Sequence, residues 1–138
     1  VYNEAVKKNY ETIPFETPSS LKNGTAYKVS TLLEKMIVDS DNGAKDLLLE
    51  NMSDEYLTGI YTDLGLVAPA DDGSYLISAK SYSLFLRILY NASYLNNENS
   101  EFALKLLSQA TFKNGLVKDL PEGTIVAHKF GEHINSTN

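Results

Sequence analysis

The chain has no cysteine among its 138 residues. A disulfide framework, a thiolate metal site and a cysteine nucleophile are therefore excluded. Positive charge is also scarce, because 12 Lys and Arg residues stand against 18 Asp and Glu residues, which gives a net charge of −6 at pH 7. The basic residues are scattered, whereas the backbone of a nucleic acid is neutralised by clustered Lys and Arg. We therefore expect no nucleic-acid partner.

Long hydrophobic runs are missing as well. No stretch approaches the ~18 consecutive apolar residues that a membrane-spanning helix requires, so we expect no membrane span. The first residues, from Val1 to Glu4, lack the basic and then apolar build of a signal peptide. The sequence begins without Met and ends shortly after a β-like run that has no evident partner strand. We interpret residues 1–138 as a single partial domain, cut from a longer protein.

Most of the sequence has the pattern of consecutive helices. Apolar residues recur at helical spacing, and turn residues separate the segments. The predicted helices are one that starts after Ser30 or Thr31 and runs to Ser40, one after Gly43, one from Ser53 or Asp54 to Gly65, one from Ala79 to about Tyr90 after Ser78, and one from Glu101 to Ala110.

Two of these helix starts carry specific predictions. Thr31 and Glu34 fit a capping box, in which the two side chains satisfy each other's backbone N–H groups. Ser100 is predicted to cap the last helix, with residues 96–99 in a loop.

The end of the chain changes character after the turn at residues 121–123. Residues 124–130 are rich in β-branched side chains and predict a strand. The predicted fold class is α+β, mostly α, with a loop-rich lead-in (1–26), a helical lobe (27–120) and a strand followed by a truncated end (121–138).

The string Ser40-Asp41-Asn42 lies between the first two predicted helices. Ser, Asp and Asn are favoured at helix ends because their side chains compete for backbone hydrogen bonds, so the tripeptide alone is ordinary for a turn between helices. Its setting is more specific. An apolar helix precedes it, the small residues Gly43 and Ala44 follow it, and a Leu-rich helix comes next.

The string His128-Lys129-Phe130-Gly131 lies in the predicted strand. A Lys on an exposed strand position is common because it aids solubility, and a Gly within a strand often marks a bulge. These general reasons explain Lys129 and Gly131 without an active site.

Together, and in this order, the two strings resemble two of the three active-site elements of the penicillin-recognising serine hydrolases, the superfamily of class A β-lactamases and D,D-peptidases. The resemblance extends from about Tyr27 to Glu132. It implies the β-lactamase/transpeptidase-like fold, of which this chain would hold the helical lobe and the first following strand. Ser40 would relay a proton to the leaving group, Asp41 would hold the turn, and Asn42 would hydrogen-bond the amide of the substrate.

The same resemblance implies roles for the second string. Lys129 would attract the substrate carboxylate and raise the positive potential of the site, and Gly131 would leave space for the substrate backbone. Phe130 would also face the substrate, but it departs from the family pattern. The family has a Thr or Ser there, which donates a hydrogen bond to the carboxylate, and Phe has no such donor. Either the substrate is held differently or catalysis is weak or lost.

The third element of the family, the nucleophile motif S-x-x-K, is not in its expected place. Ser19-Ser20-Leu21-Lys22 spells the motif, but it lies between Pro18 and Asn23-Gly24, which is a poor setting for a helix. We interpret it as a chance match and expect the nucleophile upstream of Val1. The isolated chain would then form no acyl-enzyme.

The Glu that class A β-lactamases carry in an Ω-shaped loop to activate the deacylating water has no evident counterpart either. The corresponding stretch, from Leu66 to Ser74, offers only Asp71 and Asp72, which we interpret as turn formers. Slow deacylation would follow, so the resemblance points to a D,D-peptidase or a penicillin-binding protein more than to an efficient β-lactamase.

We therefore predict that the parent protein is a serine hydrolase that opens a β-lactam or a D-Ala-D-Ala amide through an acyl-enzyme. The resemblance implies a small-molecule or peptidoglycan-peptide substrate, no cofactor, and export to the bacterial cell envelope or secretion. The missing remainder of the domain would be the main partner of this chain. His128 and His133 have no third ligand nearby in the sequence, so no metal site is expected.

Two alternatives remain open. One is a non-catalytic peptidoglycan-binding or scaffold domain that retains the fold. The other is a purely structural helical domain in which the two strings match by chance.

Overall fold

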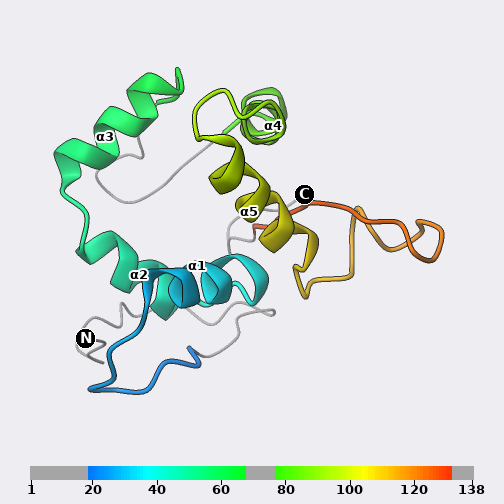
Figure 1. Cartoon of the computed structure of the whole chain (residues 1–138). Coiled ribbons are helices and arrows are strands. Elements are labelled where there is room, and N and C mark those ends of the chain that lie inside the picture. Colours follow the sequence, from blue (N-terminus) through cyan, green and yellow to red (C-terminus); the bar gives the residue numbers. More distant parts are fainter. Residues whose placement is uncertain (1–18, 68–76, 132–138) are drawn as a thin grey trace. The chain divides into compact units, whose positions relative to one another are not determined.

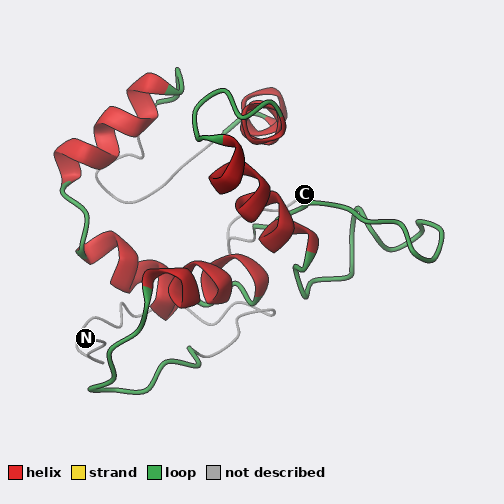
Figure 2. Ribbon diagram, viewed as in Figure 1, coloured by secondary structure: helices red, strands yellow, loops and turns green. Residues whose placement is uncertain are grey.

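The structure is a computed structural model that describes residues 19–67 and 77–131. These ranges hold five α-helices and no strand, which confirms the mostly α fold class (Figures 1 and 2). The helices are α1 (Val29–Val38), α2 (Asn42–Glu50), α3 (Asp54–Asp63), α4 (Ala79–Tyr90) and α5 (Asn97–Ser108). None of these helices is long and apolar enough to cross a bilayer. The predicted lead-in, the turn at Asp71 and Asp72, and the end of the chain with His133 lie wholly or largely outside the described residues.

The chain divides into two compact units. One unit contains residues up to 50 and from 105 onward, and the other contains residues 51–104. The first unit holds both the Ser40-Asp41-Asn42 string and the His128-Lys129-Phe130-Gly131 string.

The core of the first unit is built where α1 packs against α2. Leu21, Leu32, Ala44 and Leu47 are buried there, and Ala44 has no exposed surface at all. Fully burying a Leu side chain contributes roughly 1.5–3 kcal/mol. This contact therefore holds the α1–α2 junction, which contains Ser40, in a defined geometry.

The start of α1 differs from the prediction. The N-cap is Lys28, no side chain makes a capping bond, and the N–H of Leu32 donates to the carbonyl of Lys28 at 3.1 Å. Thr31 therefore lies inside the first helical turn, where its backbone cannot adopt the extended conformation that an N-cap needs. The capping-box prediction for Thr31 is wrong.

The helices of the second unit mostly begin and end as their sequence predicts. Ser53 and Ser78 cap α3 and α4 by accepting hydrogen bonds from the N–H groups of Tyr56 and Ser81. Gly65 ends α3 with a φ of +66°, and the N–H of Leu66 donates to the carbonyl of Tyr61 at 2.8 Å. This is the Schellman arrangement, in which a left-handed residue lets the chain fold back on the last turn.

The start of α5 lies earlier than predicted. The side-chain oxygen of Asn96 accepts a hydrogen bond from the N–H of Asn99 at 2.8 Å, and the helix begins at Asn97. Asn caps a helix as well as Ser does, and the earlier cap adds a turn to the helix. Ser100 is consequently inside the helix, buried at 2% exposure, and its hydroxyl has no hydrogen-bond partner within the described structure.

Residues 124–130 do not form a strand in the structure. A strand is defined by a ladder of backbone hydrogen bonds to a neighbour, and the described residues offer no second strand. The N–H of His128 instead donates to the carbonyl of Leu107 near the end of α5, at 3.2 Å. The strand prediction for this segment is wrong for the described part of the chain.

Candidate active site

Ser40 occupies a strained position directly after α1. Its φ is +56°, in the left-handed region that side chains disfavour. The carbonyl of Lys35 accepts hydrogen bonds from the N–H groups of both Asp39 and Asp41, so the chain wraps around the end of the helix at this point. A residue held in such a conformation costs roughly 1–3 kcal/mol and persists only where its surroundings enforce it.

Asp41 is the residue that enforces this turn. Its side chain is buried at 3% exposure, and one carboxylate oxygen caps α2 by accepting from the N–H of Ala44 at 3.0 Å. The other oxygen accepts from the N–H of Ser20 at 2.7 Å and from the Ser20 hydroxyl at 2.9 Å. Burial raises the pKa of Asp41, but hydrogen bonds from Ser20, Ala44 and Ser19 outweigh it and leave the pKa below its usual value. The carboxylate is therefore ionised at neutral pH.

Ser20 belongs to the Ser19-Ser20-Leu21-Lys22 string, which is not helical. Its hydroxyl donates to Asp41 and accepts from the Lys35 ammonium at 2.7 Å. The expectation that this string is a poor setting for a helix is confirmed, and Ser19 and Lys22 therefore do not share a helix face. No local pattern in the sequence signals that Ser20 supports Asp41.

Lys129 lies against Ser40 across 89 positions of sequence. The Lys129 ammonium donates to the Ser40 hydroxyl oxygen at 2.5 Å and to the carbonyl oxygen of Phe130 at 3.0 Å. Both residues are half-buried, and burial lowers the pKa of Lys129. The structure thus brings together the two residues that the sequence suggested as catalytic.

The remaining residues of the two strings lie around this contact. Asn42 is the first residue of α2 and is half-buried. The Phe130 ring lies 4.3 Å from the Lys129 ammonium and stacks on Phe112, with ring centroids 4.1 Å apart. Gly131 is exposed, and a Cβ placed on it would meet no atom within 4 Å. The packing of the described chain does not itself require glycine at this position.

The contact between Ser40 and Lys129 is suited to proton transfer. Because the Lys129 ammonium donates to the Ser40 oxygen, the hydroxyl proton of Ser40 remains available to a different acceptor. A nearby cation also stabilises negative charge that develops on a reacting group.

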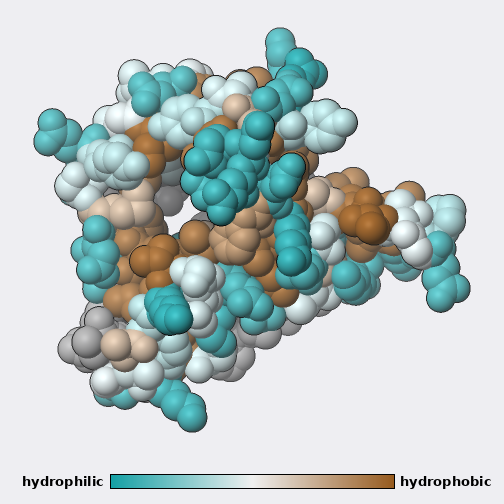
Figure 3. Space-filling view, in the orientation of Figure 1, coloured by the Kyte–Doolittle hydropathy of each residue, from teal (hydrophilic) through white to brown (hydrophobic). Residues whose placement is uncertain are grey.

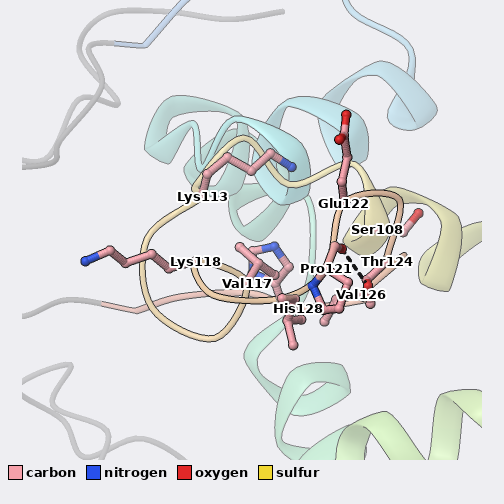
Figure 4. Close-up of a pocket in the computed structure, with 10 residues that line it drawn as sticks. Ser108, Lys113, Val117, Lys118, Pro121, Glu122, Thr124, Val126 and His128 are labelled. Carbon is pink, nitrogen blue, oxygen red and sulfur yellow. Dashed lines mark hydrogen bonds between the residues drawn. The ribbon is translucent and has the colours of Figure 1, made fainter.

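A pocket of roughly 290 Å³ is lined by His128, the residue that precedes Lys129 in the sequence (Figure 4). His128 lines it, is buried at 6% exposure, and extends toward its centre, whereas Lys118 extends away from it. Burial lowers the pKa of His128, and the positive charges of Lys113 and Lys129 lower it further. The lining of the pocket includes neither Ser40 nor Lys129, so this pocket is not the candidate site. The residues that line it are Ser108, Lys113, Val117, Lys118, Leu120, Pro121, Glu122, Thr124, Val126 and His128.

Metal ligands are not grouped in the part of the chain that the structure describes. No set of three or more His, Asp or Glu side chains there is arranged to hold a metal ion.

The structure places a Ser-Asp-Asn turn between α1 and α2, with the Lys129 ammonium on the hydroxyl of Ser40. In comparison with family models, the model of the beta-lactamase enzyme family matches residues 6–138. The chain belongs to this family, and the resemblance drawn from the two strings is confirmed. Comparisons with curated proteins and with solved structures find no match.

Proposed function

We propose that this chain contributes the Ser-Asp-Asn and Lys elements of an acylating serine hydrolase, which acts on a β-lactam or a D-Ala-D-Ala amide. The observation that supports this proposal is the 2.5 Å contact between the Lys129 ammonium and the Ser40 hydroxyl oxygen. Membership of the beta-lactamase enzyme family supports a hydrolase with a small-molecule substrate. The nucleophilic Ser of an S-x-x-K segment would come from a longer protein, upstream of Val1.

The proposed reaction has two halves. The nucleophilic hydroxyl attacks the carbonyl carbon, a C–O bond forms, and the amide C–N bond breaks. Ser40 gives its hydroxyl proton to the departing nitrogen and recovers a proton that the nucleophile has released. Water then hydrolyses the ester, which releases the acid and restores the nucleophile.

The other residues of the site bind and orient the substrate in this proposal. Lys129 attracts the substrate carboxylate and keeps the Ser40 hydroxyl oriented. Asn42 hydrogen-bonds the substrate amide, and the open space at Gly131 admits the substrate backbone. Asp41 holds the turn. The protein would act outside the cytoplasm, in the bacterial cell envelope or as a secreted protein.

A second candidate function rests on Phe130. Its ring gives no hydrogen bond to a carboxylate, and it is already stacked on Phe112. A domain that binds peptidoglycan or serves as a scaffold, without acylation, fits this substitution.

Intact-mass spectrometry with a fluorescent penicillin separates the two functions. The samples are the full-length parent, the present chain alone, a Lys129→Ala variant of the parent and, as a matched control, a Lys118→Ala variant. We expect a covalent adduct on the parent, none on the chain alone, and acylation about a hundredfold slower in Lys129→Ala. Lys118→Ala should acylate as the parent does. A folded parent that gives no adduct would rule out the hydrolase and favour the scaffold.

A further inference from the structure

The contact between Ser40 and Lys129 needs support from other parts of the chain. A hydrogen bond that involves one charged partner contributes about 1.5–3 kcal/mol. Ordering the backbone of one residue costs roughly 1–2 kcal/mol. One bond between residues 89 positions apart therefore cannot order the segments on both sides of it.

The first support connects the end of α1 to the segment after α5. Both the N–H and the side-chain hydroxyl of Thr111 donate to the carbonyl of Val38, each at 3.0 Å. Val38 is the last residue of α1 and lies just before the strained turn at Ser40. Thr111 therefore anchors its own segment to the helix end that carries Ser40, across 73 positions of sequence.

The second support acts on the residues that flank Lys129 on both sides. His128, which precedes Lys129, donates its N–H to the carbonyl of Leu107 at 3.2 Å. Phe130, which follows Lys129, stacks on Phe112 with an angle of 22° between the rings. The same short segment thus contacts both neighbours of Lys129 and the helix that ends before Ser40.

Buried residues lie within this segment and directly before it. Ala110 is buried at 2% exposure, and Leu106, which precedes the segment in α5, is buried at 5%. The Lys113 ammonium donates to the carbonyl of Ala110 at 2.9 Å, which ties the end of the segment to the residues that follow it. A rigid base is what a positioning element requires, because a catalytic group must be held within about 0.5 Å of its productive place.

We propose that residues 107–112 form a bridging segment that positions Lys129 on Ser40, with Thr111 as the principal positioning residue. The catalytic importance of this positioning rests on the proposed function, whereas the positioning itself is a property of the chain. The family match covers these residues but assigns no role to any of them.

The test compares variants by NMR of the Lys129 side chain. Thr111→Val keeps the shape of the side chain and removes only the hydroxyl bond to Val38. Phe112→Ala removes the ring stack, and Thr111→Ser retains the hydroxyl. The matched control is Thr62→Val, which loses a hydroxyl-to-carbonyl bond of the same 3.0 Å length within α3.

In Thr111→Val and Phe112→Ala, we expect the Lys129 side chain to move away from Ser40 and into water. The pKa of Lys129 should then rise toward its ordinary value, and the Overhauser contact between the two side chains should weaken at least threefold. Thr111→Ser and Thr62→Val should leave both quantities unchanged. If Phe112→Ala fails to fold, the result for Thr111→Val is sufficient to test the proposal.

A lower melting temperature with an unchanged Lys129 pKa and an unchanged Overhauser contact would overturn the proposal, because the segment would then be merely structural. Failure of the proposed function looks different. The parent would form no penicillin adduct, while Lys129 would still respond to Thr111→Val.

Discussion

Within residues 19–67 and 77–131, two non-glycine residues adopt left-handed backbone conformations, and they differ in what their side chains do. Ser40, with a φ of +56°, directs its hydroxyl to Lys129. Ala92, with a φ of +46°, closes α4, where the N–H of Ser93 donates to the carbonyl of Ile88 at 3.1 Å. At Ser40 the strain accompanies a long-range side-chain contact with Lys129, whereas at Ala92 only the fold-back of the helix end requires it.

Replacing Ala92 with Gly should stabilise the chain. Gly adopts the left-handed conformation without strain, which stabilises the folded chain. Gly also has more conformational entropy in the unfolded chain, which opposes folding, but this cost is smaller than the strain that is relieved. We therefore expect the free energy of unfolding to rise by about 0.5 kcal/mol. Urea denaturation measures it. Ala103→Gly, in the middle of α5, is the control and should cost about 1 kcal/mol. Equal destabilisation by both substitutions would contradict the argument.

Asp41 should make the stability of the chain depend on pH. Its pKa in the folded chain lies below its usual value, so its contribution is present above the unfolded pKa and is lost as pH falls through the folded pKa. Asp41→Asn should lower the free energy of unfolding by about 2 kcal/mol at neutral pH, and the difference should shrink below about pH 4. Urea denaturation curves recorded over the range from acidic to neutral pH measure this difference. The exposed neighbour Asp39→Asn should stay within about 0.5 kcal/mol of the wild type.

At the scale of elements, the helix starts show how several polar residues compete for one role. Ser53, Ser78 and Asn96 each accept a bond from the N–H three residues on. Ser30, Thr31 and Ser100 were equally suitable in sequence but lie inside helices. A cap is the residue just outside the first hydrogen-bonded turn, so the position where that turn closes decides which residue caps.

Truncating a true cap and a false one should give different results. Ser53→Ala removes the acceptor for the N–H of Tyr56 and should cost about 1 kcal/mol. Ser30→Ala should be neutral or slightly stabilising, because Ala has the higher helix propensity and Ser30 makes no capping bond. Thermal unfolding of the two variants provides the comparison. A loss at Ser30 as large as that at Ser53 would show that Ser30 does cap α1.

At the scale of the whole molecule, buried apolar surface is concentrated in one unit. The cluster of Leu21, Leu32, Ala44 and Leu47 lies between α1 and α2, whereas α3 and α4 contain no buried residue. The first unit also exposes large apolar side chains. Figure 3 shows hydrophobic colour on the loop after α5, where Leu116 and Ile125 are 81% and 84% exposed.

Amide hydrogen exchange should follow this distribution. The amides of α2 open only when the buried cluster is disrupted, so we expect them to exchange about tenfold or more slowly than those of α3 and α4. Exchange followed by mass spectrometry or NMR gives the order. Equal exchange rates for the amides of α2 and α4 would contradict this prediction.

How much could be predicted from the sequence differs between the fold and the site. Helical periodicity identified all five helices of the described residues, because the spacing of apolar side chains is a local property. The start of α5 was misplaced because Asn96 and Ser100 are both good caps. Residues 124–130 have strand composition, but a strand also needs a partner, which composition does not supply.

The sequence by itself determined the family, through two short strings whose order and setting are specific, and it suggested Ser40 and Lys129 as the residues to examine. Only the tertiary structure decided that the Lys129 ammonium lies 2.5 Å from the Ser40 hydroxyl oxygen. It also revealed Ser20 on Asp41 and Thr111 on Val38. Such contacts join residues that are far apart in the chain, so no local periodicity or motif encodes them, and they exist only once the core has brought the segments together.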